Sequence, residues 1–130
     1  MEEGALGKEY YDREIICRQG EIGDCMYVVQ VGQVEVLQEE SGHEVVIANL
    51  RSGAIFGEMA IIDRRPRSAT VRAKGKARVL TLDKRAFLRR VHEDPSLAFQ
   101  ILQQMSQRIR KSDQELSRLR GILSQGKGTV

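Results

Sequence analysis

Short apolar segments, separated by dipeptides that contain one glycine, fill the first two-thirds of this 130-residue chain, and they constrain its fold more than any other feature. Strands at such regular spacing predict an antiparallel barrel or jelly roll. Gly32-Gln33 has glycine first, as a two-residue hairpin loop prefers, so we expect a hairpin joining 26–31 to 34–37. Further turns are expected at Gln19-Gly20, Ser41-Gly42, Ser52-Gly53 and Lys74-Gly75-Lys76, the last between strands at 69–73 and 78–82.

The pattern changes to helical after Leu82. Asp83 is a suitable N-cap for a helix that runs to about Glu93, and Pro95 suits the first turn of the next helix. The second helix is expected to reach Leu119 or beyond and to end before Gly121. The prediction is therefore a mainly β fold with C-terminal helices: an antiparallel jelly-roll barrel (8–83), a short helix and a long dimerisation helix (84–123), then a flexible tail (124–130).

Bulk composition limits the classes of protein. The length fits one domain, an apolar share of 41% can supply its core, and a charged share of 30% favours a soluble surface. No apolar run is long enough to span a bilayer, and the acidic N-terminus is unlike a signal peptide, so we expect a cytoplasmic protein without membrane contact. Cys17, Cys25 and the two histidines lack metal-ligand spacing, so no metal is expected.

Basic residues cluster between positions 64 and 78. The cluster is explained either as a solvated face near an anion site or as a nucleic-acid contact. Aromatic platforms for single strands are nearly absent, with 5% aromatic residues, so we expect no direct nucleic-acid binding. The residues are Arg64, Arg65, Arg67, Arg72, Lys74, Lys76 and Arg78.

Residues 56–71 combine one carboxylate, Glu58, with one arginine, Arg67, across a glycine, a short apolar helical turn and a proline. Gly57 allows close approach of the backbone to a ligand, and the amides that follow begin a helix whose N-terminal end attracts negative charge. Arg67 offers a planar fork for two phosphate oxygens. Glu58 would repel a bare phosphate, so it fits a ligand that also carries hydroxyls. A sugar phosphate meets both demands.

This segment reads F-G-E-M-A-I-I, a short loop, then R-S-A-T-V, and it resembles the phosphate-binding cassette of the cyclic nucleotide-binding domain family. The stretch from Gly20 to Val36 is similar to the G-E-x-G-D-x-x-Y core of that family. Similarity extends over residues 8–120, and the chain resembles in particular the sensor half of bacterial catabolite activator-type (cyclic AMP receptor) proteins. The resemblance implies that Glu58 takes the ribose 2′-hydroxyl and Arg67 the cyclic phosphate.

The resemblance also implies the remaining cassette ligands and the choice of base. Serine at position 68 matches the bacterial cyclic AMP factors, so cyclic AMP is favoured over cyclic GMP. Three apolar strand residues are candidates for the pocket wall, although each is equally explained as ordinary core. The candidate site residues in the barrel are Phe56, Gly57, Glu58, Met59, Ala60, Arg67, Ser68, Ala69, Val36, Ile47 and Val71.

A heptad repeat runs through the long helix. Its positions are Leu102, Met105, Ile109, Ser112, Leu116, Leu119 and Leu123, at alternating steps of three and four. In a parallel pair, Arg108 would face Asp113 and Glu115 would face Arg120, and both pairs attract. We therefore expect a parallel homodimer through residues 102–123. The alternative is that the apolar stripe packs on the barrel.

Ser112 is the polar member of this repeat. A bond to a preceding backbone carbonyl would satisfy its hydroxyl. The resemblance implies a second role, a hydrogen bond to the base, because Ser112 aligns with a base-contacting threonine of the catabolite activator type. Asp113 stands where that type has a serine from the partner chain, which leaves both adenine and guanine open. Arg108 aligns with an arginine that reaches the cassette glutamate, and pairing with Asp113 is its alternative role.

These features predict a regulatory sensor that binds a cyclic mononucleotide, moves its C-terminal helices and acts on an unknown effector protein. No nucleophile–base arrangement is visible, so no enzymatic activity is expected. One alternative is a dimerisation or interaction module whose pocket is weak or lost. Another is the sensor fragment of a larger transcription factor or regulated enzyme, because only seven residues follow Leu123 and no DNA-binding domain fits there.

Overall fold

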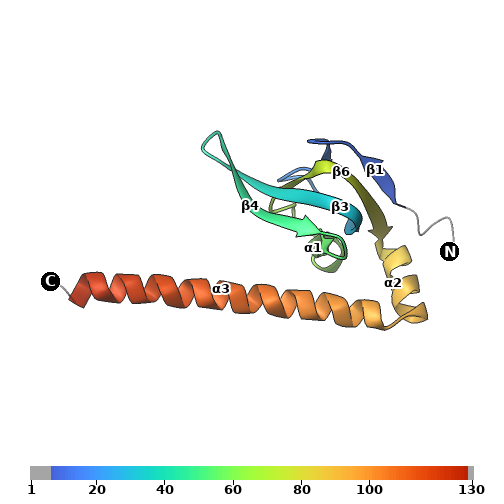
Figure 1. The fold of residues 1–130 in the computed structure, drawn as a ribbon. Coiled ribbons are helices and arrows are strands. Elements are labelled where there is room, and N and C mark those ends of the chain that lie inside the picture. Colours follow the sequence, from blue (N-terminus) through green and yellow to red (C-terminus); the bar gives the residue numbers. More distant parts are fainter. Residues whose placement is uncertain (1–6, 129–130) are drawn as a thin grey trace. The chain divides into compact units, whose positions relative to one another are not determined.

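The computed structural model describes residues 7–128, with side chains described as far as Ser124. Contacts within the chain define two compact units, residues 1–89 and residues 90–130. The first unit holds all the described strands, and the second holds the long C-terminal helix (Figure 1). Among the described residues, no helix is both long enough and apolar enough to cross a membrane.

The sheet has six strands in the order β1-β6-β3-β4, with β2 also pairing with β6 and β5 with β3. Every pairing is antiparallel, which confirms the predicted mainly β architecture. β3 and β6 pair along most of their length and form the frame of the unit (Figure 1). The strands are β1 (Lys8–Tyr10), β2 (Ile15–Cys17), β3 (Cys25–Glu40), β4 (His43–Arg51), β5 (Ile55–Phe56) and β6 (Thr70–Asp83).

Two expected turns are instead irregularities within long strands. The predicted hairpin at Gly32-Gln33 is wrong, because β3 continues through it, and β6 likewise continues through Gly75. Both glycines have positive φ, 84° at Gly32 and 72° at Gly75, and the β3–β6 register shifts beside Gly32. A glycine in the left-handed region bends a strand at a bulge without reversing it. The two long strands can therefore curve and stay paired.

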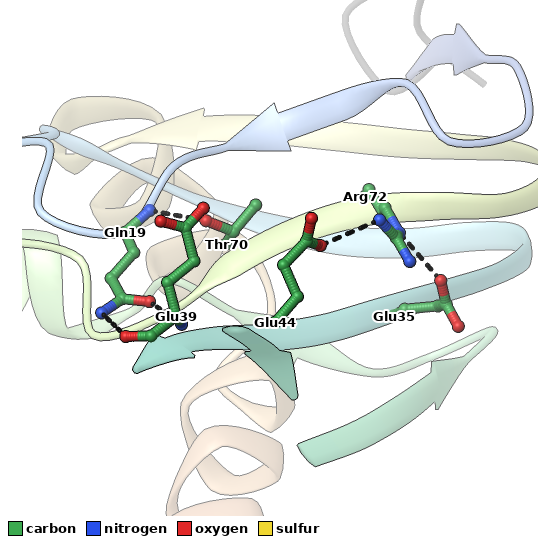
Figure 2. Close-up of polar contacts among 6 residues, drawn as sticks. All are labelled: Gln19, Glu35, Glu39, Glu44, Thr70 and Arg72. Carbon is green, nitrogen blue, oxygen red and sulfur yellow. Dashed lines mark hydrogen bonds and ion pairs between the residues drawn. The ribbon is translucent and has the colours of Figure 1, made fainter. Parts of the chain in front are cut away.

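The hairpin predicted at Ser41-Gly42 is present and joins β3 to β4, with Glu40 opposite His43. Polar side chains tie this hairpin to neighbouring segments (Figure 2). Arg72 on β6 binds Glu35 on β3 through Nε at 2.9 Å and Glu44 on β4 through Nη1 at 3.2 Å. Gln19 accepts a bond from the Glu39 amide at 2.8 Å and donates its own amide to the hydroxyl of Thr70 at 2.9 Å.

The core of the first unit is a cluster of buried, mostly apolar side chains. Its buried members come from β1, β2, β3, β5 and β6, so these strands contribute to one apolar interior. Small residues of β6, Ala73 and Ala77, let its backbone lie close to this core. The buried cluster consists of Tyr10, Cys17, Tyr27, Val29, Val34, Phe56, Val71, Ala73, Ala77 and Val79.

Three helices follow the predicted order: α1 (Met59–Ile62), α2 (Lys84–Glu93) and α3 (Ser96–Gly128). The expected N-cap is confirmed, since the Ala86 amide donates to Asp83 Oδ1 at 2.7 Å. α3 is longer than predicted: it passes through Gly121 and includes residues 124–128, which we had expected in a flexible tail. A single glycine costs a helix only about 1 kcal/mol, too little to end it. Residues 129–130 of that predicted tail lie outside the described residues.

Candidate anion-binding site

The segment between β5 and β6 contains the predicted cassette. Gly57 has φ +75°, and this left-handed conformation turns the chain from β5 into α1. Glu58 is the N-cap residue of α1, and its carbonyl accepts bonds from the amides of Ile61 and Ile62, both at 3.1 Å. α1 is only four residues long. Its macrodipole is correspondingly small, so anion binding here depends on Arg67 and individual amides more than on the helix.

Glu58 and Arg67 are both buried, with exposed fractions of 4% and 9%. Within the part of the chain that the structure describes, Thr70 is the one other polar or charged residue that is as buried. Burying a charge is unfavourable unless hydrogen bonds or opposite charges compensate it. The fold therefore buries two charged side chains, at a cost in free energy, in the segment that the sequence predicts to bind a ligand.

Arg67 is held at its backbone and at its guanidinium. Its amide donates to Glu21 O and its carbonyl accepts from the amide of Gly20, each at 2.8 Å. The guanidinium donates from Nη1 to Gly57 O at 3.2 Å and from Nη2 to Cys25 O at 3.0 Å, with Cys25 Sγ at 3.5 Å from Nη2. The β2–β3 loop and the start of β3 thus fix the arginine in place.

Aromatic rings complete the environment of Arg67. Its Cζ lies 5.2 Å from the centroid of the Tyr27 ring, within the range of a cation–π contact. Tyr27 stacks in turn on Phe56, with centroids 4.9 Å apart and an interplanar angle of 20°. Phe56 therefore packs on the tyrosine that lies next to the arginine. Its predicted contact with the ligand itself stays a prediction.

Burial raises the pKa values of two groups near Arg67, Tyr27 and Cys17. It raises the pKa of the Tyr27 phenol, and hydrogen bonding with Cys25 adds to this rise. Burial also raises the pKa of the Cys17 thiol, while the positive charge of Arg67 partly opposes it. Both groups are neutral at physiological pH already at their ordinary pKa values, and the shifts extend that neutrality to higher pH. Neither group is therefore an anionic neighbour of Arg67.

The other predicted cassette residues divide into buried and exposed groups. Ala60, Ala69 and Val71 are buried, and Val36 is partly buried against the core cluster. Met59 and Ser68 are exposed, and the Ser68 carbonyl accepts a bond from Gln38 Nε2 at 3.3 Å. Ile47 on β4 is 48% exposed, so the structure does not place it in the core.

Three further predicted residues, Arg108, Ser112 and Asp113, lie on α3 in the second unit, where their side chains are exposed. Their expected contacts with a base remain predictions.

Three residues around the guanidinium, namely Gly23, Cys25 and Tyr27, were not predicted as site residues. A signal was available, because all three belong to the G-E-x-G-D-x-x-Y block that we had noted as a family resemblance. The block predicted similarity without assigning a role to its members. Their role emerges only from the fold, which brings this loop against Arg67, more than forty positions later.

Known proteins resemble this chain in sequence and in fold. A family model described as the cyclic nucleotide-binding domain matches residues 7–94. The cAMP-dependent protein kinase regulatory subunit of Blastocladiella emersonii is 41% identical over 81 residues, which make up 62% of this chain and 20% of that protein. The chain thus spans about a fifth of that relative's length.

Two solved structures share the fold. The catabolite activator protein of Thermus thermophilus has a TM-score of 0.78 and 30% identity, covering 86% of this chain and 53% of that one. The regulatory domain of Toxoplasma gondii PKA, solved with cAMP, has a TM-score of 0.60 and 33% identity, covering 65% of this chain and 34% of that one.

Proposed function

The chain belongs to the cyclic nucleotide-binding domain family, and from that premise we propose that it is a regulatory sensor that binds cyclic AMP in preference to cyclic GMP. The observation that carries the proposal is the buried pair of Glu58 and Arg67 in one cassette. Arg67 would bind the cyclic phosphate through its charged fork, and Glu58 would accept the ribose 2′-hydroxyl. Ser68, next to the arginine and exposed, would add a hydroxyl at the phosphate.

Helix α3 supplies the second part of the proposal. Five of its seven heptad positions are at least 45% exposed, namely Leu102, Ile109, Leu116, Leu119 and Leu123, while Met105 is half-buried and Ser112 is exposed. An apolar stripe of this size favours pairing with a second copy as a parallel coiled coil through 102–123. A chain that sediments as a monomer at micromolar concentration would contradict this pairing.

In the paired state, Ser112 and Asp113 would face the base, and Arg108 would help to hold Glu58. Nucleotide binding would then favour one arrangement of the C-terminal helices, a shift of population rather than catalysis. We propose a cytoplasmic, non-enzymatic module that acts on a separate effector. A dimerisation module with a lost pocket and a sensor segment of a larger regulated protein are the alternatives.

Calorimetric titration of the 130-residue chain with cyclic AMP and cyclic GMP tests the proposal. We expect binding at micromolar or tighter concentration, with cyclic AMP the tighter ligand. Arg67→Leu is expected to weaken cyclic AMP binding by about a hundredfold, because the phosphate loses a bidentate charged partner. Arg65→Leu, which removes a charge that is 74% exposed and paired with Asp63, is the matched control and should change affinity little.

Two results of these titrations would decide against the proposed function or against the proposed site. If neither nucleotide binds the folded wild-type chain, the sensor is rejected in favour of a module with a lost pocket. If Arg67→Leu binds as tightly as the wild type, nucleotide is bound at another site.

A further inference from the structure

Gly23 lies beside the arginine of the candidate site and leaves it the space it occupies. A Cβ atom built on Gly23 would lie 2.2 Å from Arg67 Nη2, 2.7 Å from Cζ and 2.8 Å from Nε. All three distances are shorter than real Cβ contacts, so any side chain at position 23 would displace the guanidinium. The backbone itself does not require glycine, because Gly23 is absent from the residues with positive φ. Space for Arg67 is thus the reason for a glycine here.

The other sides of the guanidinium are equally defined. A Cβ on Gly57 would lie 2.5 Å from Nη1, so that nitrogen also fits against a residue without a side chain. The Tyr27 ring lies 5.2 Å from Cζ and is itself buried and stacked on Phe56. The carbonyls of Gly57 and Cys25 accept from Nη1 and Nη2. Two glycines, one ring and two carbonyls thus surround a single orientation of the fork.

We infer that Gly23 and Tyr27 are positioning residues of the phosphate site, which hold the Arg67 guanidinium in its binding orientation before any ligand arrives. The inference rests on the proposed function, in which Arg67 takes the cyclic phosphate. An arginine side chain has high rotamer entropy, and ordering it during binding reduces affinity. Because the two glycines, the Tyr27 ring and the two carbonyls already order the guanidinium in the free protein, binding does not incur that cost. The same surroundings also hold the planar fork in one orientation, which a bidentate contact with two phosphate oxygens would use.

Affinities of four variants for cyclic AMP, measured in the full chain, test the role. Gly23→Ala is expected to bind about ten- to hundredfold more weakly, because the displaced guanidinium loses charge-assisted bonds. Tyr27→Leu is expected to lose about three- to thirtyfold, the range of a partly buried cation–π contact. Tyr27→Phe retains the ring and should bind like the wild type. Gly42→Ala is the matched control: its φ of +80° makes alanine strained, but no atom lies within 4 Å.

Gly42→Ala should lower the melting temperature without changing affinity, which separates loss of stability from loss of positioning. A double-mutant cycle then asks whether Gly23 acts through the guanidinium. In an Arg67→Lys background there is no fork to displace, so Gly23→Ala should change affinity by less than about twofold. Wild-type affinity in Gly23→Ala, or a full additional loss in the lysine background, would overturn the inference.

A readout without nucleotide keeps the inference separate from the proposed function. In nitrogen-15 spectra of the ligand-free chain, the restrained guanidinium should give distinct Nη1 and Nη2 signals, assigned by their disappearance in Arg67→Lys. These signals should merge in Gly23→Ala and Tyr27→Leu and persist in Gly42→Ala. If the wild type binds no nucleotide but shows this pattern, the proposed function is wrong, while the positioning of Arg67 by Gly23 and Tyr27 is confirmed. If Gly23→Ala does not fold, the comparison of Tyr27→Leu with Tyr27→Phe decides.

Discussion

Glu58 and Arg67 are buried in the same segment. Around Arg67, carbonyl oxygens and a ring face orient the guanidinium. A phosphate that reaches this arginine meets a positive charge in a site of reduced dielectric constant. Glu58 would repel that phosphate unless its oxygens were occupied by hydroxyl donors, so the two residues together select for a sugar phosphate.

Glu58→Gln tests this division of labour at the level of one atom. Glutamine keeps the shape and one acceptor oxygen but loses the charge, so cyclic AMP binding is expected to weaken about five- to tenfold. The 2′-deoxy analogue of cyclic AMP has no hydroxyl to occupy Glu58, so titration calorimetry should show that it binds the variant more tightly than the wild type, because glutamine removes the repulsion of the phosphate. An equal loss for both ligands would show that Glu58 acts through something other than the ribose hydroxyl.

Among the elements, β3 and β6 determine where the cassette lies. β3 extends over 16 residues and β6 over 14, and the glycine bulges let both bend while their pairing continues. At Gly32 a Cβ would lie 2.4 Å from the carbonyl oxygen of Lys76, so the glycine is needed both for its positive φ and for the close approach of two backbones. The bulge is therefore part of the frame that supports the site.

Gly32→Ala is expected to destabilise the fold by more than about 2 kcal/mol, because left-handed strain and a collision with backbone act together. Gly53→Ala provides the control, since Gly53 has φ +93° but nothing within 4 Å of its Cβ position. This control should lose only about 1 kcal/mol. Urea unfolding measures both variants, and an equal loss in the two would mean that the contact with Lys76 contributes nothing.

The same glycine explains the limit of prediction from the sequence. A glycine with positive φ serves a tight turn and a bulge equally well, and strand-like segments precede and follow both Gly32 and, beyond a few charged residues, Ser41-Gly42. Local pattern placed both segments in strands and found one hairpin correctly, but only the pairing of β3 with β6 decides that Gly32 does not reverse the chain. Cassette residues Glu58 and Arg67 were predictable because they stand in one short segment. Gly23 and Tyr27 were not, because their contact with Arg67 is made by the fold.

On the scale of the whole first unit, buried acidic groups link stability to pH. Burial raises the pKa of Cys17 above its ordinary value of 9.0, and it raises the pKa values of Tyr10 and Tyr27 above 10.0. A raised pKa means that the folded chain holds protons which the unfolded chain releases. The stability from these neutral groups is therefore complete below about pH 9 and is lost as the pH rises further.

The melting temperature should stay nearly constant from neutral pH to about pH 9 and then fall steeply. Cys17→Ala removes the group with the lowest ordinary pKa of the three, so its decline should begin nearer pH 10, where the tyrosines begin to titrate in the unfolded chain. Each variant is compared with its own value at neutral pH, which cancels the small cavity left by alanine. Parallel wild-type and variant curves between these two pH values would show that folding does not raise the pKa of the Cys17 thiol.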